Sequence, residues 1–321
     1  MELKQQEAHQ AVDVSDWESD DEFVVYPEGA RDKSRLNCPV DTGHAFLIAD
    51  HHYMFKHSRD RYPEQYWVEI LAYRLGVEIG VPVPPAFVAF DSDNGKPGAL
   101  IEWFYKTSDE GMEGYVQGGD YMQRIIPDYD RKEGKQHNFE TITTICKALK
   151  QHANLADNWL EYWAKVFTFD ALLGNTDRHH DNWGVIFRRG ALEEEIELRM
   201  SPAFDNGTSM GHEILSEKFA AFSNPPRTER YVARGKHHMK WRRSDAGQIN
   251  HGVFLQEFVA KYPLARGWML ECLDTKPDVL SAIVNKLTEF DVLVPLSPER
   301  AEFMSDLLIY RNNYLKTLLA A

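Results

Sequence analysis

The stretch that decides the fold of this chain reads Gly174-Asn175-Thr176-Asp177-Arg178-His179-His180-Asp181-Asn182-Trp183-Gly184. It follows a run whose apolar residues recur at helical spacing, and an apolar, strand-like run begins at Gly184. Reactive side chains are usually displayed on loops held by such rigid elements. Asp177 and Asn182 stand five positions apart, which is the D-x-x-x-x-N spacing of phosphoryl-transfer sites. The spacing predicts that Asp177 accepts the proton of a substrate hydroxyl and that Asn182 helps to hold a magnesium ion.

A second motif, Asp205-Asn206-Gly207, follows a predicted β-hairpin formed by strands at 184–187 and 195–200. It resembles the D-F-G element, whose aspartate binds the magnesium that bridges the nucleotide phosphates. Magnesium prefers oxygen ligands, so one carboxylate and one amide oxygen suit it. Taken alone, Asn-Gly is typical of a plain turn. The joint pattern predicts Asp205 and Asn182 as the metal ligands.

The first hundred residues read as a small sheet with one helix. Short apolar runs predict four strands, at 45–49, 53–56, 86–90 and 99–104. The first two are expected to form a hairpin across 50–52. Apolar residues at positions 68, 71, 72 and 75 predict a helix that Gly76 closes.

Lys56 ends the second of these strands, where the strand-three lysine of kinases stands. A lysine near a sheet core needs a carboxylate partner, and Glu69, on the edge of the helical stripe, is the expected one, with Glu64 as the alternative. The glycine-rich phosphate loop is weak: around Gly43 and His44 there is a single glycine. Phosphate binding would therefore depend on these backbone amides, on Lys56 and on the metal.

The rest of the chain is mostly helical, with helices expected over 160–174 and 297–318. A strand-rich front and a helix-rich back indicate an α+β protein of two lobes. We expect the smaller, β-rich lobe over 31–105 and the larger, helical lobe over 106–321. Residues 1–30 hold nine acidic residues and one base, which is typical of a flexible, solvated tail. The alternative is an arm that docks onto the protein itself or binds a partner.

The composition of the chain disfavours several classes of protein: nucleic-acid binders, membrane proteins, and proteins held by disulfides or zinc fingers. The chain has 36 Lys+Arg and 50 Asp+Glu, a formal charge of −14, which disfavours general or sequence-specific nucleic-acid binding. No apolar run approaches the ~18 residues of a membrane helix. Three cysteines without CxxC spacing disfavour a disulfide framework or a zinc finger. We therefore expect a soluble, cytoplasmic protein without membrane partners; an effector secreted into another cell's cytoplasm is the alternative.

The central motif, together with Asp205 and the strand lysine, resembles the HipA-like serine/threonine kinases, whose kinase-like fold is distantly related to the phosphoinositide kinases. The resemblance covers roughly residues 36–318 and corresponds to the compact form of the family. It implies that Asp177 is the catalytic base, that Asn182 and Asp205 bind Mg²⁺, and that His179 braces the loop.

The same resemblance implies an ATP-dependent enzyme that uses Lys56, paired with Glu69, on the nucleotide phosphates. The segment Glu102-Trp103-Phe104 falls where the family's interlobe hinge holds the adenine by backbone hydrogen bonds. A protein serine or threonine is the implied acceptor. A toxin or effector role on translation components and an antitoxin-like DNA-binding partner are further implications.

Against the acidic whole, residues 227–243 hold seven Lys or Arg and one Glu, a local charge of +6. This segment is either a solvated face that pairs with the acidic tail, or a docking surface for an acidic or tRNA-bound partner. Three alternatives to a protein kinase stay open: a phosphoinositide-like lipid or small-molecule kinase, a pseudokinase, and a non-catalytic nucleotide-binding module.

Overall fold

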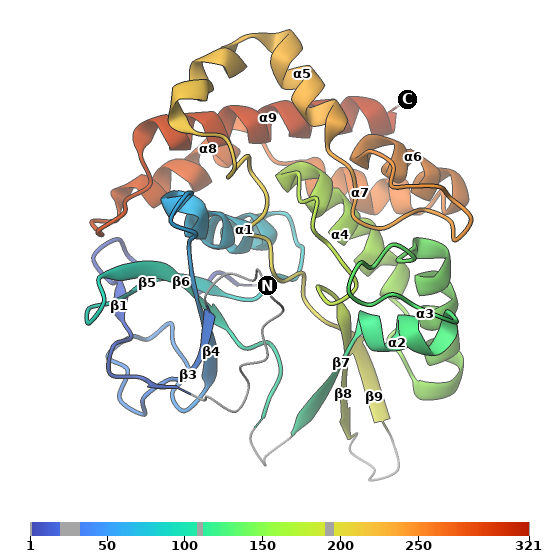
Figure 1. The fold of residues 1–321 in the computed structure, drawn as a ribbon, viewed down its shortest axis with the longest axis horizontal. Helices are drawn as coiled ribbons and strands as arrows, with labels where there is room; N and C mark the ends of the chain where they lie inside the picture. Colours follow the sequence, from blue (N-terminus) through green and yellow to red (C-terminus); the bar gives the residue numbers. More distant parts are fainter. Residues whose placement is uncertain (1, 20–32, 108–111, 190–195, 321) are drawn as a thin grey trace. The chain divides into compact units, whose positions relative to one another are not determined.

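The structure is a computed structural model, and it describes residues 2–19, 33–107, 112–189 and 196–320 (Figure 1). The chain forms two compact units. Unit 1 contains residues 1–103, 206–225 and 275–309, and unit 2 contains residues 104–205, 226–274 and 310–321. The division expected from the sequence, 31–105 and 106–321, is consecutive, whereas the later segments of unit 1 return to it from beyond residue 205.

Unit 1 is built on a six-stranded sheet with the order β1-β5-β6-β4-β3-β2. Its strands are β1 (Val12–Asp13), β2 (Glu18–Ser19), β3 (Lys33–Asn37), β4 (His52–His57), β5 (Ala86–Asp91) and β6 (Lys96–Glu102). All neighbours are antiparallel except β1, which runs parallel to β5. The sheet is therefore mixed, with its one parallel pair at the β1 edge.

The hairpin expected from the apolar runs 45–49 and 53–56 is wrong. β4 pairs instead with β3, with Lys33 opposite Lys56 and Asn37 opposite His52. Residues 45–49 form turns in the connecting loop, although Phe46 and Leu47 are buried. An apolar run that covers a core from a loop has the same composition as a strand, so periodicity cannot separate the two.

The N-terminal segment is docked, in contrast to the flexible tail expected for residues 1–30. Val12 and Val14 are buried, and Gln6 is buried with both side-chain ends hydrogen-bonded to the backbone of Val88 (2.8 and 2.9 Å). The amide of Lys4 donates to the Tyr73 hydroxyl at 2.8 Å. Residues 20–30 lie outside the described part of the chain. The acidic side chains of this N-terminal segment do not need to be buried, because its apolar and amide side chains make the contacts with the rest of unit 1.

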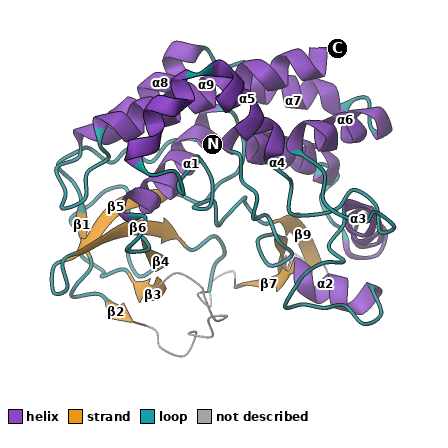
Figure 2. Ribbon diagram, turned by 45° about the horizontal axis from the view of Figure 1, so that its top comes forward, coloured by secondary structure: helices purple, strands orange, loops and turns teal. Residues whose placement is uncertain are grey.

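One face of this sheet is covered by α1 (Trp67–Glu78), whose side chains are buried over nearly the whole helix (Figure 2). A 3-10 turn, η2 (Pro63–Tyr66), leads into it. α1 ends at Glu78, so Gly76 lies within the helix and does not close it as predicted. A Cβ at Gly76 would meet the side chain of Val83 at 2.5 Å. Unit 1 also contains η3 (Ser216–Ser223), α8 (Pro277–Asn285), η4 (Lys286–Glu289) and the first half of α9 (Pro298–Ala320).

Unit 2 combines a three-stranded antiparallel sheet, ordered β7-β8-β9, with helices. The strands are β7 (Glu113–Gln117), β8 (Gly184–Arg189) and β9 (Ile196–Met200), so the predicted hairpin 184–200 is confirmed. The helices are α2 (Gly118–Ile125), α3 (Phe139–Ala153), α4 (Trp159–Leu173), α5 (Pro225–Arg234), α6 (His251–Lys261) and α7 (Ala265–Leu273). The apolar α4 lies at the centre, in contact with α6, α7 and β9.

The predicted helices over 160–174 and 297–318 correspond to α4 and α9. Within the described parts of the chain, no helix is both long and apolar enough to cross a membrane.

Candidate active site

The loop that follows α4 begins at a glycine where any side chain would be strained. Gly174 takes the left-handed conformation (φ 67°), and a Cβ on it would lie 2.1 Å from Nη2 of Arg311. Nη1 of Arg311 donates to the carbonyl of Leu173 at 2.5 Å and so caps the end of α4. The direction in which the chain enters the loop is therefore fixed by the helix end.

Local hydrogen bonds shape the loop around Asp177. The amide of Asp177 donates to Oδ1 of Asn175 at 2.9 Å, which is an Asx turn. The side-chain nitrogen of Asn182 donates to the carbonyl of Asp177 at 2.8 Å. Because the Asn182 nitrogen is used in this way, its oxygen is the atom that can bind a cation.

Beneath the loop lies a fully buried ion pair between Asp170 of α4 and Arg178. Nη2 and Nε of the guanidinium donate to the two carboxylate oxygens at 2.8 and 3.1 Å, a bidentate arrangement. Asn175 donates to the same carboxylate at 3.2 Å, and Nε2 of His237 lies 3.5 Å from it. Burial alone would raise the pKa of Asp170, but the Arg178 charge and the hydrogen bonds lower it to about 2.

Arg178 also connects the loop to the segment that carries Asp205. Its Nη1 donates to the carbonyl of Asn182 at 3.2 Å and to the carbonyl of Phe204. Asp205 itself takes a left-handed backbone conformation (φ 58°). One side chain thus joins the backbones on which both predicted metal ligands stand.

His179 lies close to both predicted catalytic carboxylates. The charges of Asp177 and Asp205 both act on its ring, although burial outweighs them and lowers the pKa of His179. Its Nδ1 accepts a hydrogen bond from the amide of Asp181 at 3.1 Å. Arg178 therefore connects the backbones that carry Asn182 and Asp205, and the charges of Asp177 and Asp205 both act on His179.

In unit 1, Lys56 and Glu69 form a buried ion pair. Nζ of Lys56 donates to Oε1 of Glu69 at 2.7 Å, and both side chains are at most 6% exposed. The alternative partner, Glu64, instead accepts hydrogen bonds from the amide and hydroxyl of Ser297, at 2.8 and 2.7 Å, at the start of α9. The lysine–carboxylate pairing expected for the strand lysine is thus present, and its role toward a nucleotide is a proposal.

Glu69 also holds the segment after Asp205. The amides of Asn206 and Gly207 donate to its two oxygens at 3.0 Å each. The carbonyl of Gly207 accepts from Nε2 of Gln65 at 2.8 Å. Asn206-Gly207 is therefore a buried segment anchored to α1 and not a plain surface turn, and a carboxylate that accepts from both Lys56 and two amides is held rigidly.

The remaining predicted nucleotide-binding residues are less open than the sequence indicates. Gly43 takes a left-handed conformation (φ 64°), but the amide of His44 donates to the hydroxyl of Thr42 at 3.0 Å. Phosphate binding by the His44 amide would therefore have to displace that hydroxyl.

The expected hinge segment shows a similar restriction. The backbone amide of Glu102 donates to the carbonyl of Pro85 at 2.8 Å, and the backbone amide of Trp103 donates to the carbonyl of His52 at 3.0 Å. The Glu102 side chain pairs with Lys4. The first segment of unit 1 ends at Trp103. Phe104 belongs to unit 2, where its ring stacks on Phe204 at 4.9 Å. Of the three expected hinge amides, two are thus already used by the sheet.

Sequence reasoning missed Asp170, Arg178 as a clamp, and His237. The signal for Asp170 was available: it is a carboxylate inside the apolar run Phe167–Leu173, and a buried carboxylate requires a cationic partner. His237 carried no such signal, because the histidine and the carboxylate it approaches are far apart in the sequence.

Comparisons with known proteins identify the fold and the family of this chain. Over 96% of both chains, the structure is similar to the crystal structure of CtkA, a proinflammatory kinase of Helicobacter pylori (TM-score 0.70, 18% identity). It is also similar to HipA of a Shewanella oneidensis MR-1 toxin–antitoxin system, solved with HipB and operator DNA (TM-score 0.51, 12% identity, 92% of this chain and 69% of that chain). No curated protein sequence matches the chain. Residues 26–255 match the model of the HipA-like C-terminal domain, and because this match spans more than half of the sequence, the chain belongs to the HipA-like family and has its kinase-like fold.

Proposed function

We propose that the protein is an ATP- and Mg²⁺-dependent kinase that transfers the γ-phosphoryl group to a serine or threonine hydroxyl of a protein. The observation that carries this proposal is the arrangement around Arg178, which joins the loop of Asp177 and Asn182 to the segment of Asp205. A base and two oxygen ligands on connected, braced backbones are what phosphoryl transfer requires of the protein.

The donor set fits magnesium. Asp205 supplies a carboxylate and Asn182 an amide oxygen whose partner nitrogen is already hydrogen-bonded, and Mg²⁺ favours such oxygen ligands while keeping several waters. When bound, the ion neutralises charge on the nucleotide phosphates. In this proposal Asn182 and Asp205 hold it, and Arg178 keeps the two ligands in register.

Asp177 is the base of the proposed reaction. Its carboxylate orients the acceptor hydroxyl and takes its proton as a bond forms from the hydroxyl oxygen to the γ-phosphorus. The bond from that phosphorus to the β–γ bridging oxygen breaks, and ADP leaves with the electron pair. The Asx turn with Asn175 and the hydrogen bond from Asn182 fix the backbone that carries Asp177.

Lys56 is proposed to bind the nucleotide phosphates. Its ion pair with Glu69 places the ammonium group, and the same carboxylate holds Asn206 and Gly207, which directly follow Asp205 in the chain. Adenine recognition is proposed at the backbone of Glu102-Trp103-Phe104, where the amides of Glu102 and Trp103 donate to the carbonyls of Pro85 and His52. Gly43 and His44 are proposed to line the phosphates.

The protein acceptor is proposed to dock at the basic segment 227–243. Six of its seven cationic side chains are exposed: Arg227, Arg230, Arg234, Lys236, Arg242 and Arg243. His237 of this segment approaches Asp170, and the ring of His238 lies 5.9 Å from that of His179. These two histidine contacts join the basic segment to the residues that support the catalytic loop. An exposed basic surface at this position supports docking of an acidic region, of the substrate itself or of a tRNA-bound substrate.

The relatives suggest the setting. The Shewanella HipA is part of a toxin–antitoxin system and is bound to HipB and operator DNA, and CtkA is a proinflammatory kinase. By analogy with these two proteins, we propose a cytoplasmic toxin or effector role, with translation components as targets and an antitoxin-like, DNA-binding protein as partner.

Incubation with γ-labelled ATP, Mg²⁺ and separate acceptors tests the proposal. The acceptors are a protein mixture, serine and threonine peptides, and vesicles of inositol lipids. Label in phosphoserine or phosphothreonine supports a protein kinase. Label in lipid alone would contradict the acceptor class, and nucleotide binding without transfer to any acceptor would favour a non-catalytic module.

A further inference from the structure

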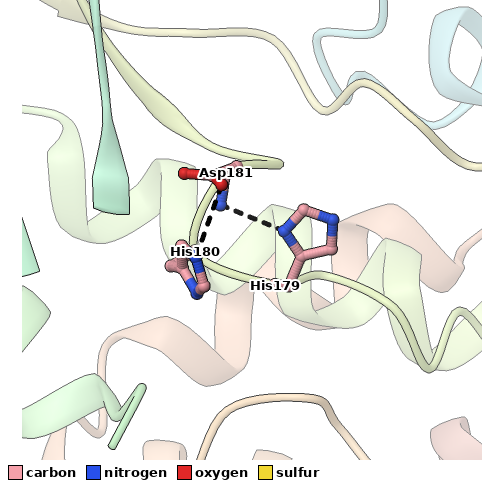
Figure 3. A group of neighbouring side chains, drawn as sticks. All are labelled: His179, His180 and Asp181. Atoms are coloured by element: carbon pink, nitrogen blue, oxygen red, sulfur yellow. Dashed lines mark hydrogen bonds and ion pairs between the residues drawn. The ribbon is translucent and has the colours of Figure 1, made fainter. Parts of the chain in front are cut away.

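Three consecutive side chains of the catalytic loop face one another: His179, His180 and Asp181 (Figure 3). Each offers one ligand atom, and the three atoms lie within 4.8 Å of one another. Nε2 of His180 is 3.4 Å from Oδ2 of Asp181. Among the described residues this His-His-Asp trio is the group of three or more such side chains close enough to hold one ion.

The spacing within the trio is that of a small transition-metal ion. Two ligands bound tetrahedrally at about 2.1 Å lie about 3.4 Å apart. The pair His180–Asp181 already has this separation, and modest rotation of the His179 ring brings in the third ligand. Two imidazole nitrogens and one carboxylate suit Zn²⁺ and its neighbours, whereas Mg²⁺ favours oxygen alone.

The Nδ1 atom of His179 carries no proton. It accepts the amide hydrogen of Asp181 at 3.1 Å, so its lone pair points toward Asp181. A metal ion bound through this nitrogen would replace the hydrogen bond from the Asp181 amide.

The surroundings complete the site. Nη2 of Arg131 donates to Oδ1 of Asp181 at 2.9 Å, which leaves Oδ2 turned toward His180. His238 lies beside His179 and is the candidate fourth ligand. Nδ1 of His238 and Nδ1 of His180 are buried and have no hydrogen-bond partner within the described part of the chain.

We infer that His179, His180 and Asp181, with His238 or a water as fourth ligand, form a site for Zn²⁺ or a similar transition-metal ion. The ligands of this site are different residues from the magnesium ligands of the proposed function, and the inference does not depend on that function. Because its ligands lie between Asp177 and Asn182 in the chain, an ion there would hold the catalytic loop in one conformation.

Calorimetric titration of the metal-stripped full-length chain with Zn²⁺ tests this site, with the visible absorption of Co²⁺ as a report on ligand geometry. We expect one ion per chain, a tetrahedral Co²⁺ spectrum, a raised Tm, and no displacement by excess Mg²⁺. His180→Asn and Asp181→Asn should each weaken Zn²⁺ binding by at least about 100-fold. Asp181→Asn keeps the shape of a partly exposed side chain, so its fold is readily checked by circular dichroism.

Two control variants make the result specific. His152→Asn removes an exposed histidine of α3 and should leave Zn²⁺ affinity unchanged. Asp205→Asn removes a proposed magnesium ligand. Its charge acts on the His179 ring, but the variant should still bind one Zn²⁺ per chain, so that a failure of the proposed function is distinguishable from a failure of this site. Wild-type Zn²⁺ affinity in both His180→Asn and Asp181→Asn, or loss of binding in Asp205→Asn, would overturn the inference.

Discussion

Asp170 and Arg178 form a bidentate ion pair in which neither side chain is exposed to solvent. The same guanidinium donates to the carbonyls of Asn182 and Phe204. The group that neutralises the Asp170 carboxylate therefore also positions the backbone of the loop at Asn182 and of the segment that leads to Asp205. Such a pair contributes little net stability, but removing one partner leaves a buried charge without compensation. Its value here is geometric.

Arg178→Lys should separate these two contributions. The lysine keeps a positive charge near Asp170 but cannot reach both carbonyls, so we expect a loss of about 2 kcal/mol in the free energy of unfolding. Arg178→Met leaves Asp170 unpaired and should cost about 3–5 kcal/mol. We expect kcat for phosphoryl transfer to fall at least about 10-fold in Arg178→Lys, with KM for ATP little changed. Urea unfolding and steady-state kinetics measure both; equal stability of all three proteins would contradict the role of the pair.

Glu69→Gln tests the anchor of Asn206 and Gly207. The variant keeps the shape of the side chain but removes the charge that pairs with Lys56 and accepts from two amides. We expect a loss of about 3 kcal/mol in unfolding free energy and a raised KM for ATP. Glu78→Gln changes an exposed residue at the end of the same helix and should leave both quantities unchanged. If the two variants behave alike, Glu69 does not have the role assigned to it.

Asp205→Asn should preserve the fold, because asparagine tolerates the left-handed conformation that Asp205 adopts. Loss of a charged ligand should raise the Mg²⁺ concentration needed for half-maximal rate and lower kcat about 10²–10³-fold. A Mg²⁺ titration of the transfer rate measures both effects. An unchanged magnesium dependence would remove Asp205 from the metal site.

The free energy of unfolding should decrease as the pH is lowered, because buried histidines bind a proton more readily in the unfolded chain. His251 is the clearest case. Burial lowers its pKa to about 3, with His237 and Arg311 adding to the effect and Asp170 opposing it. Above about pH 6.5 the ring is neutral in both states. Below that pH the unfolded chain binds a proton that the folded chain does not, so the unfolding free energy should fall by up to about 1.4 kcal/mol per pH unit.

Urea unfolding at pH 7.5, 6 and 5 measures this slope. His251→Gln should be less stable than the wild type at pH 7.5 but should lose less stability on going to pH 5. A slope identical to that of the wild type would show that His251 is not the titrating group.

Gln6→Ala tests the docking of the N-terminal segment. Its side chain satisfies both the amide and the carbonyl of Val88, so we expect a loss of about 2 kcal/mol in unfolding free energy. Gln5→Ala alters the exposed neighbour and serves as the matched control. Wild-type stability of Gln6→Ala would indicate that the segment is not part of the folded unit.

The sequence was most informative where chemistry and spacing coincide. The loop 174–184, the hairpin 184–200 and the helix before them could be predicted, because an apolar helix, a polar loop and a β-branched strand have distinct periods. The pairing of Lys56 with Glu69 followed from the need of a buried lysine for a carboxylate. The roles of these residues toward a nucleotide stay predictions.

The sequence was least informative where tertiary contacts override composition. The acidic N-terminal segment looked solvated, yet residues with alternating burial, Val12 and Val14, add it to a sheet edge. The apolar run 45–49 looked like a strand, yet it covers the core from a loop. The Asp170–Arg178–His237 cluster joins an α4 residue to a distant segment, and no local pattern predicts such a pairing.

The transfer rate of Asp177→Asn tests the central claim most directly. With γ-labelled ATP, Mg²⁺ and the best protein acceptor, we expect the rate to fall by about 10²–10⁴-fold while ATP binding and the unfolding free energy are retained. Asp157→Asn changes an exposed aspartate of the same unit and should keep the full rate. Transfer by Asp177→Asn at a rate close to that of Asp157→Asn would contradict the assignment of Asp177 as the base, and with it the account of this site as a kinase centre.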